Sequence, residues 1–135
     1  MLELNKIDDR ELQKIISFII EDNLLLNTFG VGNNIKSRIL NSCYACFVTL
    51  DGVDIGFINV ILNDNTYEID MGISSMYRGR GYGTKALCLL KNNILKDVSN
   101  IIIQTEKVNI AANKSIMNNS FRLIKKDKKY NYYSI

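Results

Sequence analysis

The segment Arg78–Thr84 reads Arg-Gly-Arg-Gly-Tyr-Gly-Thr and decides the fold of this 135-residue chain. It lies between an alternating apolar stretch that ends at Ser74 and a stretch in which apolar residues recur at helical spacing from Leu87 to Ile94. Glycines allow a tight turn and a close approach of a ligand to backbone N–H groups. The first turn of the following helix adds unpaired amides and the positive end of the helix dipole. The segment therefore predicts an anion site, with a phosphate or pyrophosphate as its natural ligand.

The residues before this segment predict an antiparallel meander. Three apolar stretches, Cys43–Leu50, Ile55–Leu62 and Thr66–Ser74, have the length and alternation of strands. Asp51-Gly52 separates the first two as a strong hairpin turn, and Asn63-Asp64-Asn65 separates the second and third. In the third strand Tyr67, Ile69, Met71 and Ile73 share one face, and Glu68 and Asp70 share the other.

The flanking segments complete a mixed α/β pattern. Helical spacing predicts a first helix from Asp9 to Asp22, with a capping signal at Asp8 and Glu11. After a loop at Gly30–Asn34 comes a short helix. A strand that follows a crossover helix pairs in parallel with the strand before it. The later elements are the short helix Ile35–Leu40, the strand Ile101–Thr105, the helix Ala111–Asn119, and a closing hairpin of Phe121–Lys126 and Tyr130–Ser134.

The kind of phosphate ligand follows partly by exclusion. The glycine spacing is not that of a nucleotide-triphosphate loop or of a dinucleotide-binding turn. The upstream meander also contradicts a Rossmann start. The alternatives to a phosphate-binding role are a purely structural turn and an RGG-like RNA contact. The RNA contact is disfavoured because the segment opens an apolar helix instead of lying in a disordered tail.

Composition narrows the class of protein. Length and a 47% apolar content predict a single domain over residues 1–135. A formal charge of +3 disfavours nucleic acid as the main partner, although Lys125-Lys126-Asp127-Lys128-Lys129 keeps a basic RNA-binding protein as a third class. No segment predicts a membrane helix or a secretory signal, and three cysteines favour a reducing compartment. We therefore expect a cytoplasmic protein.

The chain has no histidine, which removes every Ser-His or Cys-His catalytic arrangement. Cys43 and Cys46 form a lone C-x-x-C, and no second pair completes a zinc site, so no metal is expected. These two residues fall inside a predicted strand, where burial on alternate faces is the expected role. Acid–base chemistry must use carboxylates, Tyr, Lys, Cys, water or backbone groups.

Two motifs resemble the GNAT superfamily of N-acetyltransferases. Arg78-Gly79-Arg80-Gly81-Tyr82-Gly83 matches the acetyl-CoA signature [Q/R]-x-x-G-x-[G/A] in its strand-turn-helix context. The helix Asn109–Phe121 is similar to the family's N-x-x-[A/S] helix. The resemblance covers Cys43 to the C-terminus. It implies an α/β (mixed α+β) single domain with a central, mostly antiparallel sheet flanked by helices. The fourth and fifth strands would be parallel and would splay into a V.

The resemblance also implies a cosubstrate site. Acetyl-CoA would lie between the fourth and fifth strands, with the amides of Met71 and Ile73 pairing with the pantetheine arm and the acetyl carbonyl. Asn109 would touch the pantetheine, and Lys114 would lie near the adenosine phosphate. The pyrophosphate would be held by Arg78 and by the backbone of Gly79, Arg80, Gly81, Tyr82, Gly83 and Thr84. An amine would attack the thioester directly, without a covalent enzyme intermediate.

Two positions depart from the family pattern. Ile116 replaces the Tyr that protonates the leaving thiolate in many relatives, which leaves the general acid unassigned. Ser120 replaces the usual Gly before Phe121, where it alters only a helix C-cap. The candidate substitutes for the missing acid are Tyr82, Tyr130, Tyr132 and Tyr133.

For a general base, Glu68 and Asp70 are the strand carboxylates nearest the expected acceptor site. Glu68 acting through water is our choice, and a solvated or salt-bridged surface carboxylate is the alternative. The sequence thus predicts an enzyme that moves acetyl from acetyl-CoA to a small amine, a protein N-terminus or a lysine, as a monomer or homodimer. A non-catalytic module that binds acyl-CoA is the alternative.

Overall fold

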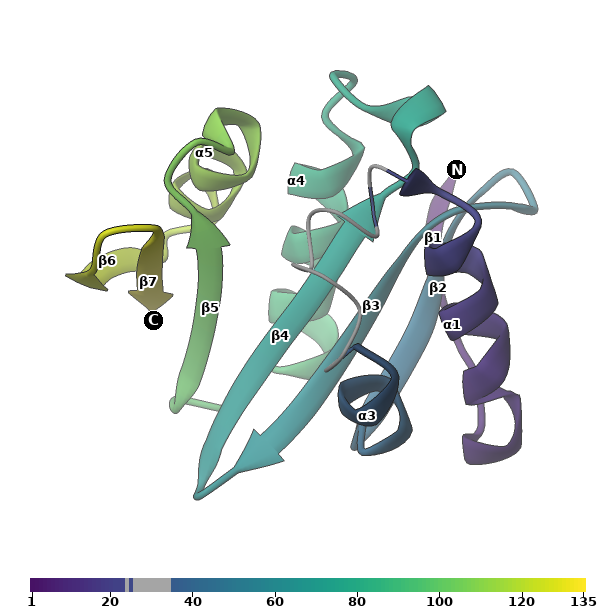
Figure 1. The fold of residues 1–135 in the computed structure, drawn as a ribbon, viewed down its shortest axis with the longest axis horizontal. Coiled ribbons are helices and arrows are strands. Elements are labelled where there is room, and N and C mark those ends of the chain that lie inside the picture. Colours follow the sequence, from purple (N-terminus) through teal and green to yellow (C-terminus); the bar gives the residue numbers. More distant parts are fainter. Residues whose placement is uncertain (24, 26–34) are drawn as a thin grey trace.

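The alternating apolar stretches form a seven-stranded sheet within the described part of the chain (Figure 1). The computed structural model describes residues 1–23, 25 and 35–135, so the predicted loop at Gly30–Asn34 lies outside it. The strand order is β1-β2-β3-β4-β5-β7-β6. The strands are β1 (Leu2–Lys6), β2 (Tyr44–Leu50), β3 (Val53–Asn63), β4 (Thr66–Ile73), β5 (Ile101–Glu106), β6 (Arg122–Lys126) and β7 (Tyr130–Ser134).

The helices lie close to their predicted positions. The first predicted helix is a 3-10 turn followed by a shorter α-helix that ends at Ile20. The helix after the glycine-rich turn ends in a π-helical turn. The helices are η1 (Asp9–Glu11), α1 (Leu12–Ile20), α3 (Ile35–Leu40), η2 (Ser75–Tyr77), α4 (Tyr82–Leu89), η3 (Leu90–Ile94) and α5 (Ile110–Asn118).

Backbone conformation explains the two tight hairpins. Asp51 and Gly52 have φ of 49° and 85°, and Asp64 and Asn65 have φ of 49° and 65°. Two successive positive φ values match the right-handed twist of the strands that a two-residue turn joins. Asp, Asn and Gly are the residues that adopt this conformation at least cost. The meander of β2, β3 and β4 therefore follows from local sequence.

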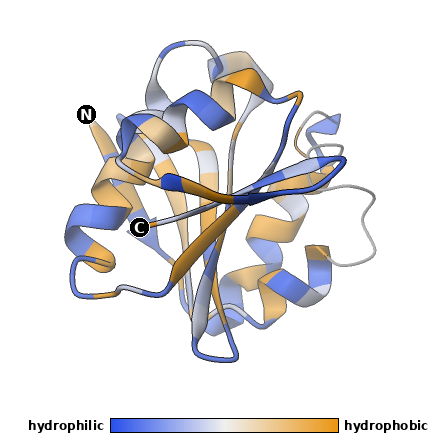
Figure 2. Cartoon of the chain, turned by 90° about the vertical axis from the view of Figure 1, so that its left-hand side faces the viewer, coloured by the Kyte–Doolittle hydropathy of each residue, from blue (hydrophilic) through white to orange (hydrophobic). Residues whose placement is uncertain are grey.

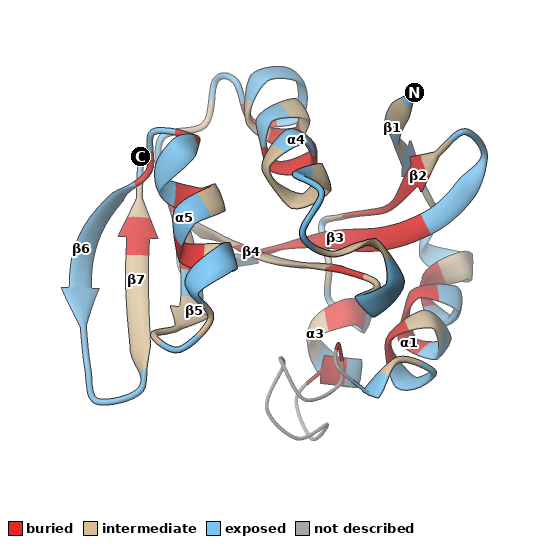
Figure 3. Cartoon of the chain, turned by 90° about the horizontal axis from the view of Figure 1, so that it is seen from above, coloured by how far each residue is buried: buried red, intermediate tan, exposed pale blue. Residues whose placement is uncertain are grey.

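Two helical layers enclose the sheet. Figure 3 shows α4 and α5 on one face and α1 and α3 on the other. Ile69 and Ile73 of β4 pack with Leu87 of α4 in the larger core cluster. The smaller cluster joins α1 and α3 to Phe47 and Phe57. Figure 2 shows the hydrophobic colour concentrated along the strands and the hydrophilic colour at the turns between them. Among the described residues, no helix is long and apolar enough to cross a membrane.

The N-terminal strand β1 was not predicted from the sequence. It pairs antiparallel with β2 from Leu2↔Leu50 to Lys6↔Cys46. Only Leu2 and Leu4 face the core, and both are only partly buried. A five-residue strand at the edge of a sheet carries too few alternations for its period to be recognised. The correction extends the sheet by one strand on the side away from β5.

The parallel junction between β4 and β5 is short. The two strands pair only at Tyr67↔Ile101 and Glu68↔Ile102. Beyond these positions β4 continues against β3 as far as Ile73, and β5 continues against β7 as far as Glu106. The sheet therefore opens into a V between the second half of β4 and the second half of β5, as expected from the family resemblance.

Candidate functional site

The backbone of β4 presents amides to the opening of the V. Tyr67 donates its N–H toward β5, to the carbonyl of Asn100 at 2.7 Å, whereas Ser74 donates toward β3, to the carbonyl of Ile55 at 2.7 Å. N–H groups alternate in direction along a strand, and the register with β3 is unbroken from Gly56↔Ile73 to Asn63↔Thr66. The N–H groups of Met71 and Ile73 therefore point to the β5 side, where β5 has already diverged.

The glycine-rich turn closes one end of this opening. Gly79 and Gly81 have φ of 77° and 82°, a region that only glycine enters readily. Gly81 is the N-cap of α4, so the first-turn amides of the helix face the turn. A Cβ added at either glycine would meet no heavy atom within 4 Å. Backbone conformation, and not crowding, is what requires glycine here. The space beside the amides is accessible to a ligand.

The basic side chains of the turn have different roles. Arg78 donates its Nε–H to the carbonyl of Ile73 at 2.8 Å, which fixes the turn to the end of β4. Burial lowers the pKa of the Arg78 guanidinium, and the charge of Asp22 opposes this shift. Arg80 is exposed, with its guanidinium 5.9 Å from the centre of the Tyr77 ring. Arg78 therefore braces the turn, and Arg80 stands at its surface with a full positive charge.

The second motif helix, α5, is fastened to the start of α4. Thr84 donates its hydroxyl to the Ser115 hydroxyl at 2.8 Å. Asn119 donates its amide to the carbonyls of Thr84 and Ser115. Asn109 caps α5 by accepting the N–H of Ala112 at 3.2 Å, so the side-chain oxygen of the motif Asn is already engaged. Lys114 is exposed on this helix.

Sequence reasoning missed Asn113, which is buried and connects α5 to two strands. Its amide donates to the carbonyls of Glu106 and Asn109, at 3.0 and 2.8 Å. Its Oδ1 accepts from the Asn131 amide at 2.9 Å and from the Tyr133 hydroxyl at 2.5 Å. Four partners hold one side chain, so Asn113 fixes the β5 and β7 side of the V relative to α5.

The candidate base lies in a charged cluster on the other face of β4. Arg38 of α3 binds Asp70 through Nε at 2.7 Å and Nη2 at 3.1 Å, and binds Glu68 through Nη1 at 3.0 Å. Asp70 also accepts from the buried Asn59 amide at 3.4 Å. Burial lowers the pKa of Arg38, but the hydrogen bonds and charges of Asp70 and Glu68 raise it overall. Both oxygens of Asp70 are thus engaged, and the second oxygen of Glu68 accepts from the Asn63 amide at 3.4 Å. Glu68 is the more exposed of the two side chains, at 28% against 18%.

The cluster of Arg38, Glu68 and Asp70 could not be predicted from the sequence. Arg38 lies in a six-residue helix thirty positions before Glu68, and nothing in the local pattern pairs the two. Glu68 lies at the last paired position of β4 and β5, so its backbone marks the apex of the V. The salt-bridged alternative foreseen for Glu68 is therefore present in the structure, and Glu68 as general base stays a proposal.

The departures from the family motif have clear structural settings. Ile116 is 5% exposed and packs in the larger core cluster. Ser120 has φ of 67°, which explains why a glycine suits this position. Two of the four candidate tyrosines have engaged hydroxyls, since Tyr133 donates to Asn113 and Tyr132 donates to Asp127 at 2.8 Å.

The cysteines do not converge on the V. Cys46 is buried, and this burial raises the pKa of its thiol to about 11. Cys43 and Cys88 are exposed, and all three are free thiols. The C-x-x-C pair therefore divides between the surface and the core. Cys46 lies in β2, whereas Cys43, predicted to lie in the same strand, directly precedes it.

Comparison with known proteins agrees with the geometry. Residues 16–114 match the model of the acetyltransferase (GNAT) family. No curated protein sequence is similar enough to the chain to be matched. The chain belongs to the GNAT acetyltransferase family, because the family model covers well over half of it.

Solved structures show the same fold at low sequence identity. RimL, a ribosomal alpha-N-protein acetyltransferase solved with coenzyme A, is 15% identical with a TM-score of 0.77, covering 99% of this chain and 93% of its own. The aminoglycoside acetyltransferase AAC(6')-Ib with coenzyme A is 14% identical with a TM-score of 0.75, covering 99% and 95%. The N-acetyltransferase PseH of Campylobacter jejuni with acetyl coenzyme A is 16% identical with a TM-score of 0.67, covering 100% and 98%.

Proposed function

We propose that this protein transfers the acetyl group of acetyl-CoA to a primary amine by direct attack. The observation that carries the proposal is the V between β4 and β5, into which the amides of Met71 and Ile73 point and which the glycine-rich turn closes. A strand-like pantetheine arm would complete the hydrogen bonding of β4 where β5 has left it. The positive end of α4 and the exposed Arg80 suit a pyrophosphate.

In this mechanism the neutral amine nitrogen attacks the thioester carbonyl carbon. A C–N bond forms, the C–S bond breaks, and the CoA thiolate takes a proton from solvent or an acid that the sequence does not assign. The amide of Met71 or Ile73 stabilises the negative charge that develops on the carbonyl oxygen. Glu68 receives the amine proton through water, since no histidine is present. Arg38 orients the Glu68 carboxylate.

The experiment that tests the proposal measures CoA release. Purified protein is mixed with acetyl-CoA and, separately, with small amines, peptides with free N-termini and lysine derivatives, and free thiol is followed with time. We expect thiol release that depends on both the protein and one class of amine. Tight acetyl-CoA binding by calorimetry with no release for any amine would instead support the non-catalytic module, to which the buried Ile116 points.

A further inference from the structure

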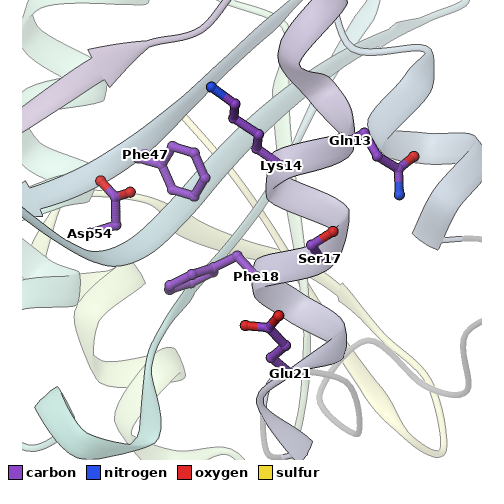
Figure 4. A pocket seen from close by; sticks show the side chains of 7 residues that line it. All are labelled: Gln13, Lys14, Ser17, Phe18, Glu21, Phe47 and Asp54. Carbon is purple, nitrogen blue, oxygen red and sulfur yellow. The ribbon is translucent and has the colours of Figure 1, made fainter.

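Two adjoining cavities follow the outer side of α1 toward the V. The first, of about 390 Å³, lies between α1 and the strands β2 and β3, and Figure 4 shows Lys14, Phe47 and Asp54 around it. The second, of about 550 Å³, lies between the end of α1 and the segment Ser74–Met76. Phe18 and Glu21 line both. We refer to the two together as the α1 groove.

The α1 groove ends beside the cosubstrate opening. Ser74 directly follows Ile73, the last residue of β4, whose amide points into the V. Asp22 connects the groove to this segment by accepting the Ser75 N–H at 3.0 Å and the Ser75 hydroxyl at 3.2 Å. A molecule that reaches the V from this side therefore passes the end of α1.

The charge of the groove is negative. Glu21, Asp22 and Asp54 line it, and Lys14 is its one basic lining residue among those described. Lys14 is bound at 2.6 Å to Glu11, which compensates its charge. Burial raises the pKa of Asp54, and the charge of Lys14 only partly offsets this. Arg78 interacts with the charge of Asp22, and Lys14 with that of Asp54, so Glu21 is the lining carboxylate that forms no salt bridge with a described residue. Acidic lining residues still outnumber basic ones, which favours a cationic ligand.

Glu21 has no structural reason to be acidic. It is the C-cap of α1, where the negative end of the helix dipole disfavours a carboxylate, and the last turn of the helix has no basic residue. Asp22 is explained by its bonds to Ser75 and to the N–H of Leu25. Glu21 is exposed, and no described residue binds its carboxylate. A local conflict of this kind is typical of a functional position.

Aromatic rings give the groove an apolar wall. Phe18 and Phe47 meet edge to face, with ring centroids 5.6 Å apart. Both side chains line the first cavity. A ring face beside carboxylates binds methylene chains and ammonium groups together. The groove therefore suits an elongated molecule that is apolar along its length and cationic at its end.

We propose that the acceptor is an elongated diamine or polyamine that uses the α1 groove as a second, ammonium-binding subsite. This inference rests on the proposed acetyl transfer and names its substrate class. One amine reacts beside Met71, and the distal ammonium lies beside Glu21 at the end of α1. From Met71 to Ser75 the chain advances four residues, or about 13 Å if fully extended. An alkyl chain advances about 1.2 Å per bond, so 1,8-diaminooctane spans about 11 Å.

The test compares 1,8-diaminooctane with octylamine, which has the same alkyl chain but lacks the distal ammonium. Calorimetric titration into the protein loaded with CoA measures binding without any need for turnover. We expect the diamine to bind about fivefold more tightly, the upper range for a partly exposed ion pair. CoA release from acetyl-CoA should show the same preference in kcat/KM. Equal affinity for the two amines would overturn the inference.

A matched pair of variants locates the subsite. Glu21→Gln should remove the preference for the diamine, and Asp97→Asn, at an exposed acid between η3 and β5, should keep it. Glu21→Gln should fold, since its carboxylate has no described partner. A preference that survives Glu21→Gln would place the distal ammonium elsewhere and contradict the inference. If calorimetry shows the preference but no amine releases CoA, acetyl transfer fails while the ammonium subsite stands.

Discussion

The two sides of the proposed site differ in the kind of group that would bind a ligand. On the proposed cosubstrate side, between Gly79 and the first turn of α4, the proposed binding groups are backbone amides held by positive φ angles. On the proposed acceptor side they are side chains: Arg38 and Glu68 under β4, and Glu21 beside α1. A backbone site depends on conformation and is damaged by any residue that changes it. A side-chain site depends on charge and can be altered without touching the fold.

The largest effect should come from Gly81→Asp. Aspartate strains a backbone with φ of 82° and places a negative charge beside the pyrophosphate position. We expect acetyl-CoA affinity, measured by calorimetry, to fall about a hundredfold, or about 2.7 kcal/mol. Gly52→Asp is the control, because Gly52 has φ of 85° and equally open surroundings but lies in the β2–β3 turn. Equal affinity of the Gly81 variant and the control would show that this turn does not hold the phosphates.

Glu68→Gln should act on rate and not on acetyl-CoA binding. We expect the maximal rate to fall roughly 10–100 fold, the lower part of the range for a general base, because water partly substitutes. An alkylamine is mostly protonated at neutral pH, so the rate of the native protein should rise with pH as neutral amine accumulates. A pH–rate profile of both proteins is the measurement. If the variant keeps the full rate and the same profile, Glu68 is a salt-bridge partner of Arg38 and not the general base.

A smaller effect should separate two tyrosines of β7. Tyr133→Phe removes a buried hydroxyl that donates to Asn113, and should lower the free energy of unfolding by about 1 kcal/mol or somewhat more in urea titrations. Tyr132→Phe removes an exposed hydroxyl bound to Asp127 and should change stability by much less. Turnover should survive in both. Loss of turnover in Tyr132→Phe alone would identify the missing general acid.

The smallest effect should come from the cysteines. A Cys43, Cys46 and Cys88 triple Ala variant that folds should keep its turnover within a few-fold, because none of the three lies in the V. Iodoacetamide should label Cys43 and Cys88 first and Cys46 last, since burial raises the pKa of Cys46 to about 11 and few thiolates form at neutral pH. Trapping of an acetyl-cysteine during the reaction would contradict direct attack.

The two sides of the proposed site also differ in how far sequence could predict them. The Arg78–Thr84 turn was predicted because its glycines, the strand before it and the helix after it are neighbours in the chain. The hairpin at Asp51-Gly52 was predicted for the same reason, and both of its residues have positive φ. Short-range conformational preference is sufficient for features of this kind.

Long-range partners could not be predicted. Arg38 meets Asp70 across 32 positions, and Asn113 meets Tyr133 across 20, so neither contact leaves a periodic trace. The same is true of β1, whose residues pair with residues of β2 that lie 40 to 48 positions further along the chain. The sequence identified Glu68 as a candidate base but gave no indication of the guanidinium beside it.

The short junction of β4 and β5 has a mechanical consequence. The sheet has two parts, β1 to β4 and β5 to β7. Two residue pairs of β4 and β5 and the contacts of α4 with α5 hold these parts together. A cosubstrate that contacts both sides of the V would hold the two parts of the sheet together. Binding only to the folded state raises thermal stability in proportion to the logarithm of ligand concentration. Hydrogen exchange of backbone amides near Met71 and Ile103 should then slow together when acetyl-CoA binds. The bound ligand would make the two parts of the sheet open as one cooperative unit.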